Sequence, residues 1–521
     1  MTPSSRWQWY GHADETLAPD WNMQWVSGPS ALSGANGISA GIDGRVYVAQ
    51  AMGAQISAID PDSGAQTLIV PQGGGMQGCD DCAMLADGAL VTTEPGANAV
   101  GVVGADGRHR HLPFELPAVN GIALDRRRQR LFVDEYREGG RLLELDPSGK
   151  SPPRVLLEDL DYPNAFSMAP DGSLYFPQVR PGEIWRYGFD SATAKPMFTG
   201  LEFPTAVKAR PDGRLVAVEA GSGKVTELDP RTGARRLLAQ VDPGIDNLVV
   251  TDDDRIIISH YLHGAITEIA SDRHTQLSPP GWVGPYDVAV RADGALLVAD
   301  GLSVAVVSGG TIKRPIYYGG GRRVLPISIA CAGPDTFVLD IYGDLLRYRD
   351  LAAPPEILAR SAHHYSRLFP WDHGSVGVVD NAGDCLLRID SRGEITPLHH
   401  VERPIAACRD GRGNLYVVHD DGRRVAMIEA TGGMRFVAGF TAAQGIACHD
   451  DALLVCDTGA RSIVSISVAN GARREILRNS PIGAAGSYQP MGGFAALCTA
   501  DEGFYVGCNG DGSIRLLHRR A

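Results

Sequence analysis

The segment NGIALDRRRQRLFVDEYREGGRLLELDPSG, which runs from Asn120 to Gly149, decides the fold. It holds a short apolar strand, a polar turn, a second strand of the type LFVDE, another polar turn, and a third strand that ends in a Pro-Ser-Gly turn. Alternation of apolar and polar residues with a period of two is typical of strands, and no long helical periodicity competes with it. The segment therefore predicts consecutive short strands joined by tight turns.

The same pattern recurs along the chain. Clear copies are NGISAGIDGRVYVAQAMGAQISAIDPDSG from Asn36, NAFSMAPDGSLYFPQVRPGEIWRYGFD from Asn164 and TAVKARPDGRLVAVEAGSGKVTELDPRTG from Thr205, and a more variable fourth strand follows each copy. The first strands of the copies begin at Asn36, Asp80, Asn120, Asn164, Thr205, Asp246, Tyr286, Ile327, Ser366, Ile405, Gln444 and Gly492. A spacing of about 41 residues is that of a four-stranded β-propeller blade.

Twelve blades in one ring would leave an unfilled hole, so we predict an all-β chain of two tandem six-bladed β-propellers. The last copy lacks a fourth strand, whereas strand-like segments at 23–27 and 275–277 precede the first and seventh copies. If each segment closes its own ring, no blade exposes an edge. The predicted domains are then an N-terminal extension (1–21), a first propeller (22–270) and a second propeller (271–521). Alternatively, 275–277 stays in the sixth blade and 23–27 crosses to the twelfth.

Net charge, hydropathy and cysteine usage indicate the cellular compartment of the protein and the class of its partners. A net charge of −13 argues against nucleic acid or an anionic membrane as a partner. The first thirty residues do not resemble a signal peptide, and no run of eighteen apolar residues occurs. Four of the nine cysteines recur at one position of the repeat, which favours buried thiols over disulfides: Cys331, Cys408, Cys448 and Cys498. We predict a cytoplasmic protein that acts on a small-molecule substrate.

The first ring carries the candidate site. In a propeller, the first strand of each blade lines the central channel, and five of the six first-strand starts of this ring are Asn or Asp: Asn36, Asp80, Asn120, Asn164 and Asp246, with Asp81 and Asn247 adjacent. The sixth start is Thr205. Such a crowd of oxygen ligands suits a hard divalent cation, with Ca²⁺ as the expected ion. Without a cation, at least one carboxyl pKa should be raised.

The second-strand ends of the first ring should open on the same face. They are Gln50, Glu94, Glu135, Gln178, Glu219 and His260, all long enough to reach inward. The corresponding positions of the second ring are mostly Asp, which favours turn capping: Asp300, Asp340, Asp380, His419, Asp457 and Asn509. The first ring is therefore expected to carry the chemistry, and the second to be structural or to shape access. Turn capping is also the alternative for each Asn or Asp of the first ring.

At these residues the chain resembles the six-bladed superfamily of gluconolactonases, luciferin-regenerating enzyme and senescence marker protein, with paraoxonases and strictosidine synthase as more distant relatives. The resemblance rests on VNGIALD around Asn120, on Pro163-Asn164, and on Asp246-Asn247 in GIDNLVV. It implies one Ca²⁺ or similar cation on the channel axis and hydrolysis of a lactone or another ester. The family's Glu-Gly-Pro in the first blade is absent, so Asn36 or Asp80 would have to replace its ligand.

The leading hypothesis is thus a metal-dependent hydrolase, with a lactone as the expected substrate. Asn120, Asn164 and Asp246, with Asp80 or Asn36, would hold the cation, and Asp246, Glu219 or His260 would act as general base. No G-x-S-x-G motif is evident. His109 and His111 are expected to be exposed.

Two rival functions stay open on the sequence alone. The same polar channel mouth would serve a propeller enzyme of another class, such as a lyase, isomerase or condensing enzyme. Alternatively, the chain is a non-catalytic interaction scaffold, because fold alone does not fix function.

Overall fold

The chain folds almost entirely into β-strands. The computed structural model describes residues 14–72, 74–271, 273–319, 324–361, 365–372, 374–449, 452–483 and 495–520. Within these ranges, the strands form antiparallel sheets, and η2 (Pro95–Ala97) is a short 3-10 helix. None of the described helices is long and apolar enough to cross a membrane. The prediction of an all-β fold of propeller-like sheets is confirmed.

The first six sheets each contain four strands that are consecutive in the chain. They are β3 (Ile38–Ala40), β4 (Val46–Gln50), β5 (Gln55–Ile59) and β6 (Gln66–Val70); β7 (Asp81–Met84), β8 (Leu90–Glu94), β9 (Ala99–Val103) and β10 (His109–His111); β11 (Val119–Asp125), β12 (Arg130–Glu135), β13 (Glu138–Leu145) and β14 (Arg154–Asp161); β15 (Ser167–Met168), β16 (Leu174–Gln178), β17 (Glu183–Gly188) and β18 (Thr193–Phe198); β19 (Pro204–Ala209), β20 (Leu215–Glu219), β21 (Lys224–Leu228) and β22 (Arg235–Gln240); and β23 (Ile245–Val250), β24 (Ile256–His260), β25 (Ile266–Ile269) and β26 (His274–Ser278).

The other six sheets take up the rest of the chain and its N-terminal strands. They are β27 (Pro285–Val290), β28 (Leu296–Asp300), β29 (Ser303–Ser308) and β30 (Thr311–Tyr317); β31 (Pro326–Ala332), β32 (Asp335–Asp340), β33 (Asp344–Tyr348) and β34 (Glu356–Arg360); β35 (Tyr365–Pro370), β36 (Val376–Asp380), β37 (Cys385–Ile389) and β38 (Ile395–His400); β39 (Ala406–Arg409), β40 (Leu415–His419), β41 (Arg424–Ile428) and β42 (Met434–Ala438); β43 (Ala443–His449), β44 (Ala452–Asp457), β45 (Ser462–Ser467) and β46 (Arg473–Arg478) with β1 (Thr16–Leu17); and β47 (Ala496–Ala500), β48 (Gly503–Cys508) and β49 (Ser513–Arg519) with β2 (Trp21–Ser27).

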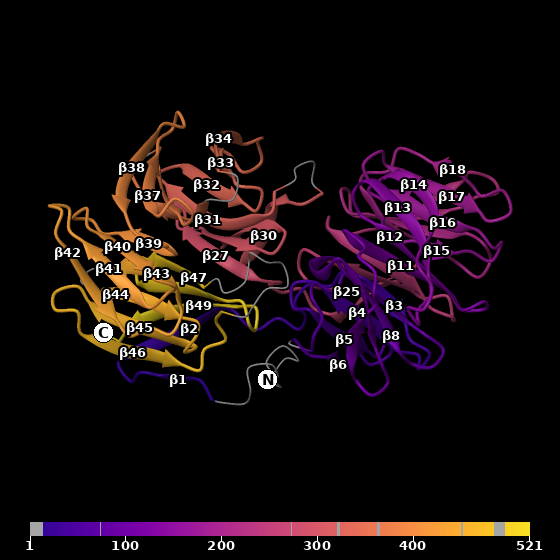
Figure 1. The fold of residues 1–521 in the computed structure, drawn as a ribbon, viewed down its shortest axis with the longest axis horizontal. Coiled ribbons are helices and arrows are strands. Elements are labelled where there is room, and N and C mark those ends of the chain that lie inside the picture. Colours follow the sequence, from indigo (N-terminus) through magenta and orange to yellow (C-terminus); the bar gives the residue numbers. More distant parts are fainter. Residues whose placement is uncertain are drawn as a thin grey trace.

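Contacts between innermost strands arrange these sheets in two closed cycles. In the first cycle β3, β7, β11, β15, β19 and β23 each contact the next, and β23 contacts β3 again. In the second, β27, β31, β35, β39, β43 and β47 do the same, and β47 contacts β27. Figure 1 shows the two groups side by side, indigo to magenta and red to yellow. We call them the first ring (β3–β26) and the second ring (β27–β49 with β1 and β2).

The predicted first-strand starts agree with the structure. Each of the first eleven lies within three residues of the beginning of an innermost strand. The twelfth, Gly492, lies outside the described residues. The repeat is therefore readable from turn chemistry and period-two patterning.

Strand pairing corrects the expected closure. The segment 23–27 belongs to β2, which pairs with β49, with Met23 opposite Leu517. The segment 275–277 belongs to β26, which pairs with β25, with His274 opposite Ile269. The expectation that each segment closes its own ring is wrong, and the alternative stated with it is correct. A short hairpin connection from β25 to β26 makes that pairing local, whereas β2 is left to cover the open edge of β49.

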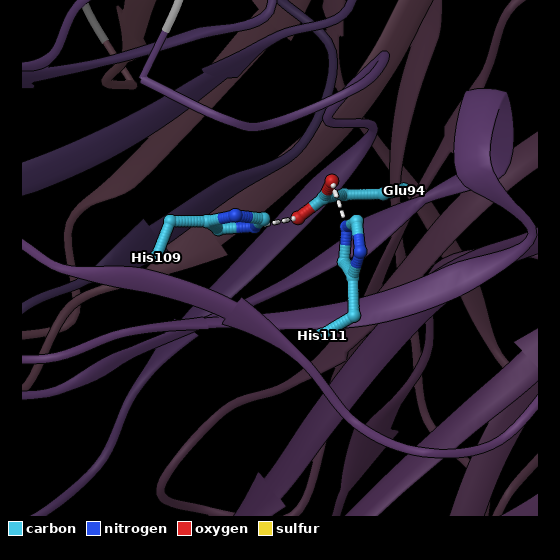
Figure 2. A group of neighbouring side chains, drawn as sticks. All are labelled: Glu94, His109 and His111. Atoms are coloured by element: carbon cyan, nitrogen blue, oxygen red, sulfur yellow. Dashed lines mark hydrogen bonds and ion pairs between the residues drawn. The ribbon is translucent and has the colours of Figure 1, made fainter.

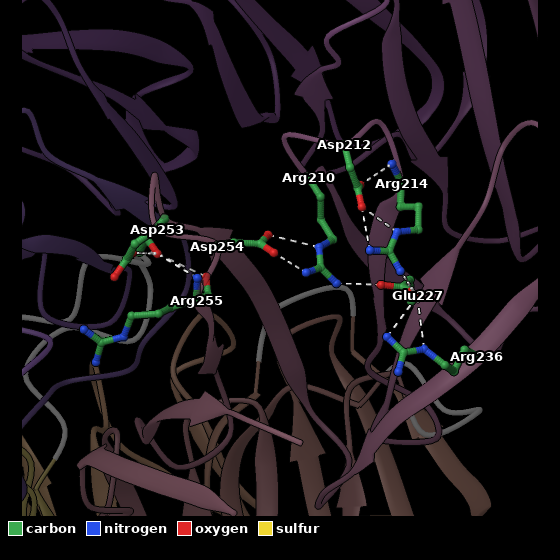
Figure 3. A network of polar contacts seen from close by, with 9 residues as sticks. Arg210, Asp212, Arg214, Glu227, Arg236, Asp253, Asp254 and Arg255 are labelled. Carbon is green, nitrogen blue, oxygen red and sulfur yellow. Dashed lines mark hydrogen bonds and ion pairs between the residues drawn. The ribbon is translucent and has the colours of Figure 1, made fainter. Parts of the chain in front are cut away.

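Ion pairs bind neighbouring sheets together at one end of the first ring. Arg210, which follows β19, contacts both Glu227 of β21 and Asp254, which precedes β24 (Figure 3). Arg255 reaches Asp62 of the first sheet at 2.6 Å, across the point where the ring closes. Glu227 also accepts Arg214 and Arg236, so three guanidinium groups surround one nearly buried carboxylate. A network of this kind holds sheets in register better than isolated surface pairs do.

Candidate functional site

One cavity lies where the innermost strands of the first ring begin. It has a volume of about 260 Å³. All six predicted first-strand starts of the first ring line it: Asn36, Asp80, Asn120, Asn164, Thr205 and Asp246. The structure therefore brings together the polar side chains that the sequence placed at the channel mouth.

The second ring supplies part of the cavity wall. Leu302, Tyr318, Leu325, Ile341 and Tyr342 line it from that side. Apolar and aromatic side chains of the first ring complete the wall, namely Met52, Tyr136, Phe203 and Tyr261. The wall of the cavity is thus built from residues of both rings.

Two carboxyl groups at the cavity lack a basic neighbour in its lining. Burial raises the pKa of Asp80 to about 7, and the charge of Asp81 adds to the shift. Burial, followed by the charges of Asp80 and Asp81, also raises the pKa of the half-buried Asp246 well above its usual value. Among the described lining residues there is no Lys or Arg. The pKa rise expected for crowded carboxylates is present.

The asparagine side chains at the cavity differ in their hydrogen bonding. Asn120 Oδ1 is buried and has no hydrogen-bond partner in the described part of the chain. Asn36 donates through Nδ2 to Asp80 Oδ1 at 3.4 Å. Asn164 Oδ1 accepts the backbone N–H of Ala165 at 2.6 Å, so local backbone capping applies to Asn164 and not to Asn120.

A second set of titratable groups lies close to these residues, with Asp81 and Lys208 on innermost strands and Asp134 on β12. Asp81 accepts hydrogen bonds from Asn247 Nδ2 at 3.2 Å and from the backbone N–H of Ile122 at 3.3 Å, and burial raises its pKa to about 6. Burial raises the pKa of Asp134 to about 8, and its Oδ2 has no partner among the described residues. Burial lowers the pKa of Lys208, against the effect of Asp81 and Asp134, and its Nζ donates to the carbonyl oxygen of Phe166 at 3.1 Å.

Sequence reasoning singled out Asp81 and Asn247 but missed Asp134 and Lys208. Lys208 carried a signal, because a lysine in the middle of the inner strand TAVKA breaks its apolar pattern. Asp134 precedes the second-strand end that received attention, Glu135.

The second-strand ends do not reach inward, and this expectation was wrong. Of the described residues, none of Gln50, Glu94, Glu135, Gln178, Glu219 and His260 lines the cavity. Glu219 accepts the backbone N–H of Glu202 at 2.6 Å, and Gln178 accepts that of Asp161 at 2.7 Å. These side chains bond the neighbouring loops, because loop N–H groups lie closer to a strand end than the channel axis does.

His260, a predicted general base, is also turned away. Its Nε2 contacts the carbonyl oxygen of Asp242 at 3.1 Å, and its ring stacks on His263 with centroids 3.5 Å apart. Burial lowers the pKa of His260 to about 3, which keeps the ring neutral at neutral pH. Of the three predicted bases, Asp246 alone lies at the cavity among the described residues.

Two aspartates of the second ring cap the turn that follows them, as predicted. Asp340 accepts the backbone N–H groups of Tyr342 and Asp344 at 3.0 Å, and Asp380 accepts that of Gly383 at 2.8 Å.

Asp300 and Asp457 bond the loop that precedes the first strand of their own blade, which differs from this expectation. Asp300 accepts the backbone N–H groups of Val283 and Gly284 at 3.0 and 2.8 Å. Asp457 accepts those of Thr441 and Ala442 at 2.8 and 2.9 Å.

Glu94, the second-strand end of the second blade, has two histidine partners. Its Oε1 lies 2.7 Å from His109 Nε2, and its Oε2 lies 2.9 Å from His111 Nε2 (Figure 2). Burial acts to raise the pKa of Glu94, but the hydrogen bonds from both histidines and from the backbone N–H of Gln77 together hold the pKa below its usual value. The expectation that both histidines are exposed was wrong for the His109 side chain, which is 7% exposed.

Comparisons with known proteins give similar structures only. No protein-family model matches the chain, and no curated protein matches it in sequence. A streptogramin B lyase shares 19% identity at a TM-score of 0.39, over 54% of this chain and 95% of that one. A virginiamycin B lyase from Staphylococcus aureus shares 17% identity at a TM-score of 0.34, over 61% of this chain and 95% of that one. A gluconolactonase from Xanthomonas campestris shares 18% identity at a TM-score of 0.40, over 47% of this chain and 88% of that one. Likenesses at these scores assign neither an activity nor a ligand to this chain.

Proposed function

We propose that the cavity of the first ring binds a divalent cation of the Ca²⁺ type and that the protein is a metal-dependent hydrolase of a lactone or another ester. One observation carries the proposal. Asp80, Asp246 and the unpartnered Asn120 Oδ1 line the same cavity, without a basic side chain among its described lining residues.

The donor set fits a hard cation. Carboxylate and amide oxygens are the ligands that Ca²⁺ prefers, and no imidazole or thiolate lines the cavity in the described part of the chain. A buried amide oxygen without a partner is costly unless something binds it, and a cation would fill that role for Asn120. Asp80, Asp246 and Asn120 would hold the ion, with Asn36 beside them. Asn164 Oδ1 already accepts one backbone N–H, and its second lone pair would be directed to the ion.

The chain's own groups supply the remaining chemistry. When bound, the cation would polarise the ester carbonyl and stabilise negative charge that develops on its oxygen. Asp246 is the predicted base that lies at the cavity, where it would accept a proton from the attacking water. Phe203, Tyr261 and Tyr318 would pack against a small substrate and exclude bulk water.

The experiment combines metal content with turnover. Purified protein is analysed for Ca²⁺ and assayed on a panel of lactones and esters, with and without a chelator, in water enriched in ¹⁸O. We expect stoichiometric Ca²⁺, chelator-sensitive turnover and one labelled oxygen in the carboxylate group of the product acid, with none in a released alcohol. Asp246→Asn should lose both metal and turnover, whereas Asp252→Asn, whose side chain is 99% exposed on the same ring, should keep both.

Three outcomes would count against the proposal. If Asp246→Asn keeps its full metal content and activity, the assignment of the cation site to this cavity is wrong. Chelator-sensitive turnover without ¹⁸O incorporation would point to a lyase or isomerase at the same cavity. No turnover and no bound metal would favour a scaffold.

A further inference from the structure

A cluster of one carboxylate and two imidazoles lies on the second blade, outside the cavity of the first ring. We propose that Glu94, His109 and His111 form a binding site for a divalent transition-metal ion of the Zn²⁺ class. The proposal does not depend on the function of the cavity, whose oxygen ligands select a different kind of ion.

The geometry brings three ligand atoms together. His109 and His111 are alternate residues of β10, so their side chains leave the same face of the strand, and Glu94 ends β8 beside them (Figure 2). The same ring nitrogen, Nε2, of each histidine points to a different oxygen of Glu94. All three ligand atoms lie within 4.8 Å of one another. An ion with bonds of about 2.0–2.2 Å reaches all three after a small side-chain shift.

The buried negative charge of Glu94 requires a positively charged partner. Its side chain is fully buried, and a buried carboxylate is stable only when it is well paired. The equivalent carboxylate one blade later, Glu135, is also fully buried and contacts Arg137 and Arg141. A guanidinium is always charged, whereas an imidazole carries a charge only when protonated. A bound metal ion would give Glu94 the positive partner that arginine gives Glu135.

The cluster has room because the strand between β8 and β10, which is β9, has a glycine beside the cluster. Gly101 of β9 lies opposite His111 and opposite Thr92. A Cβ atom added at Gly101 would come 2.0 Å from Glu94 Oε1 and 2.7 Å from His109 Nε2. Thr92 and the backbone N–H of Gln77 each donate to Glu94 at 2.9 Å and orient the carboxylate. The site is thus held in place by groups that would not bind the metal themselves.

The ligand set also defines the ion. Two imidazole nitrogens and one carboxylate oxygen suit Zn²⁺ and its first-row neighbours, and they leave a coordination position open. The side chain of His111 is 33% exposed, which gives the ion a path from solvent. Each Nε2 must be free of its proton to bind the metal, so affinity should fall as the pH drops.

The test uses the full-length, untagged protein after removal of metals with a chelator. Zn²⁺ is titrated in the presence of excess Ca²⁺, which occupies oxygen-rich sites, and Co²⁺ is added separately to record its visible absorption spectrum. We expect one tight Zn²⁺ per chain and a Co²⁺ spectrum of nitrogen and oxygen ligation. His109→Gln and His111→Gln should each weaken Zn²⁺ binding by at least about 100-fold, since loss of a group that only orients a ligand already weakens it by about 10- to 100-fold.

Three further variants make the outcome decisive. Gly101→Ala should block the site while circular dichroism reports an intact fold. His400→Gln, at an exposed histidine of β38, should bind Zn²⁺ like the parent protein. Asp246→Asn should also keep its Zn²⁺, which separates this site from the cavity. Absence of stoichiometric Zn²⁺, or equal affinity in the parent and both histidine variants, would show that the cluster is held by hydrogen bonds alone.

Discussion

Tyr261 of the first ring donates the hydrogen of its hydroxyl group to the backbone carbonyl oxygen of Tyr318, which follows the outer strand of the first blade of the second ring. The two residues also line the same cavity. Phe203 packs edge-on against the Tyr318 ring, with centroids 5.9 Å apart. The wall of the cavity and the contact between the rings are therefore built from the same side chains.

We expect Tyr261→Phe to weaken the contact between the two rings without creating a cavity in the core. The variant keeps the buried ring but leaves the Tyr318 carbonyl unpaired, so the free energy of unfolding should fall by about 1 kcal/mol. Urea denaturation followed by fluorescence measures the change. Tyr175→Phe removes a hydroxyl that bonds within one blade, to Asp171 at 3.4 Å, and serves as the control. An equal and small effect of both variants would contradict a special role for Tyr261.

The stability of the metal-free protein should depend on pH in an unusual direction. Burial raises the pKa of Asp81, Asp80 and Asp134 to about 6, 7 and 8. The folded state then binds more protons than the unfolded state between their ordinary pKa values and these raised ones. The stability contributed by these groups is therefore fully present below about pH 4 and is lost as the pH rises to about 8.

Thermal denaturation in a chelator at several pH values checks this prediction. Added Ca²⁺ should flatten the curve in the parent protein, because a bound cation stabilises the ionised carboxylates. The effect of Ca²⁺ should be lost in Asp246→Asn. A metal-free protein that grows more stable from pH 5 to pH 8 would contradict the prediction.

The repeat and the channel mouth were predictable because both follow local rules. A turn every ten residues or so and period-two alternation identify the innermost strands, and residues at equivalent positions of each copy must meet on one axis. Asp80 and Asp246, which are far apart in the chain, could be brought to one cavity by counting alone.

The errors arose where local geometry decides the direction of a side chain. Glu219 and His260 have the length to reach the axis, but loop groups beside each strand end bind them first. Ring closure was also misjudged, because β2 pairs with β49 across almost the whole chain, and no local pattern records such a partner. The histidine and glutamate cluster depends on Gly101, which reads in the sequence as an ordinary strand residue.

Lys208 should matter more at alkaline pH than at acidic pH. It is the charged neighbour that opposes the pKa rise of Asp81 and Asp134. Lys208→Met would leave these carboxylates without that positive charge, so the free energy of unfolding should fall by about 1–3 kcal/mol at pH 8. At pH 5 the carboxyls are largely protonated and the loss should be smaller. Chemical denaturation at both pH values tests this, and an equal loss at both would mean that lost packing dominates.

The innermost strands of the second ring hold a nearly buried ion pair. Arg367 contacts Asp287 at 3.0 Å with both side chains nearly buried, and it donates to the carbonyl oxygens of Gln444 and Ala495. Arg367→Leu would leave Asp287 buried without its cation, so we expect a loss of about 3–5 kcal/mol. Adding Asp287→Asn should recover part of this loss, because the buried charge is removed while a polar acceptor remains. Urea denaturation of the two single variants and the double variant measures the coupling between the two side chains. The Ca²⁺ binding that we propose for the first ring should be unaffected. Additive losses in the double variant would show that the two side chains stabilise the second ring independently.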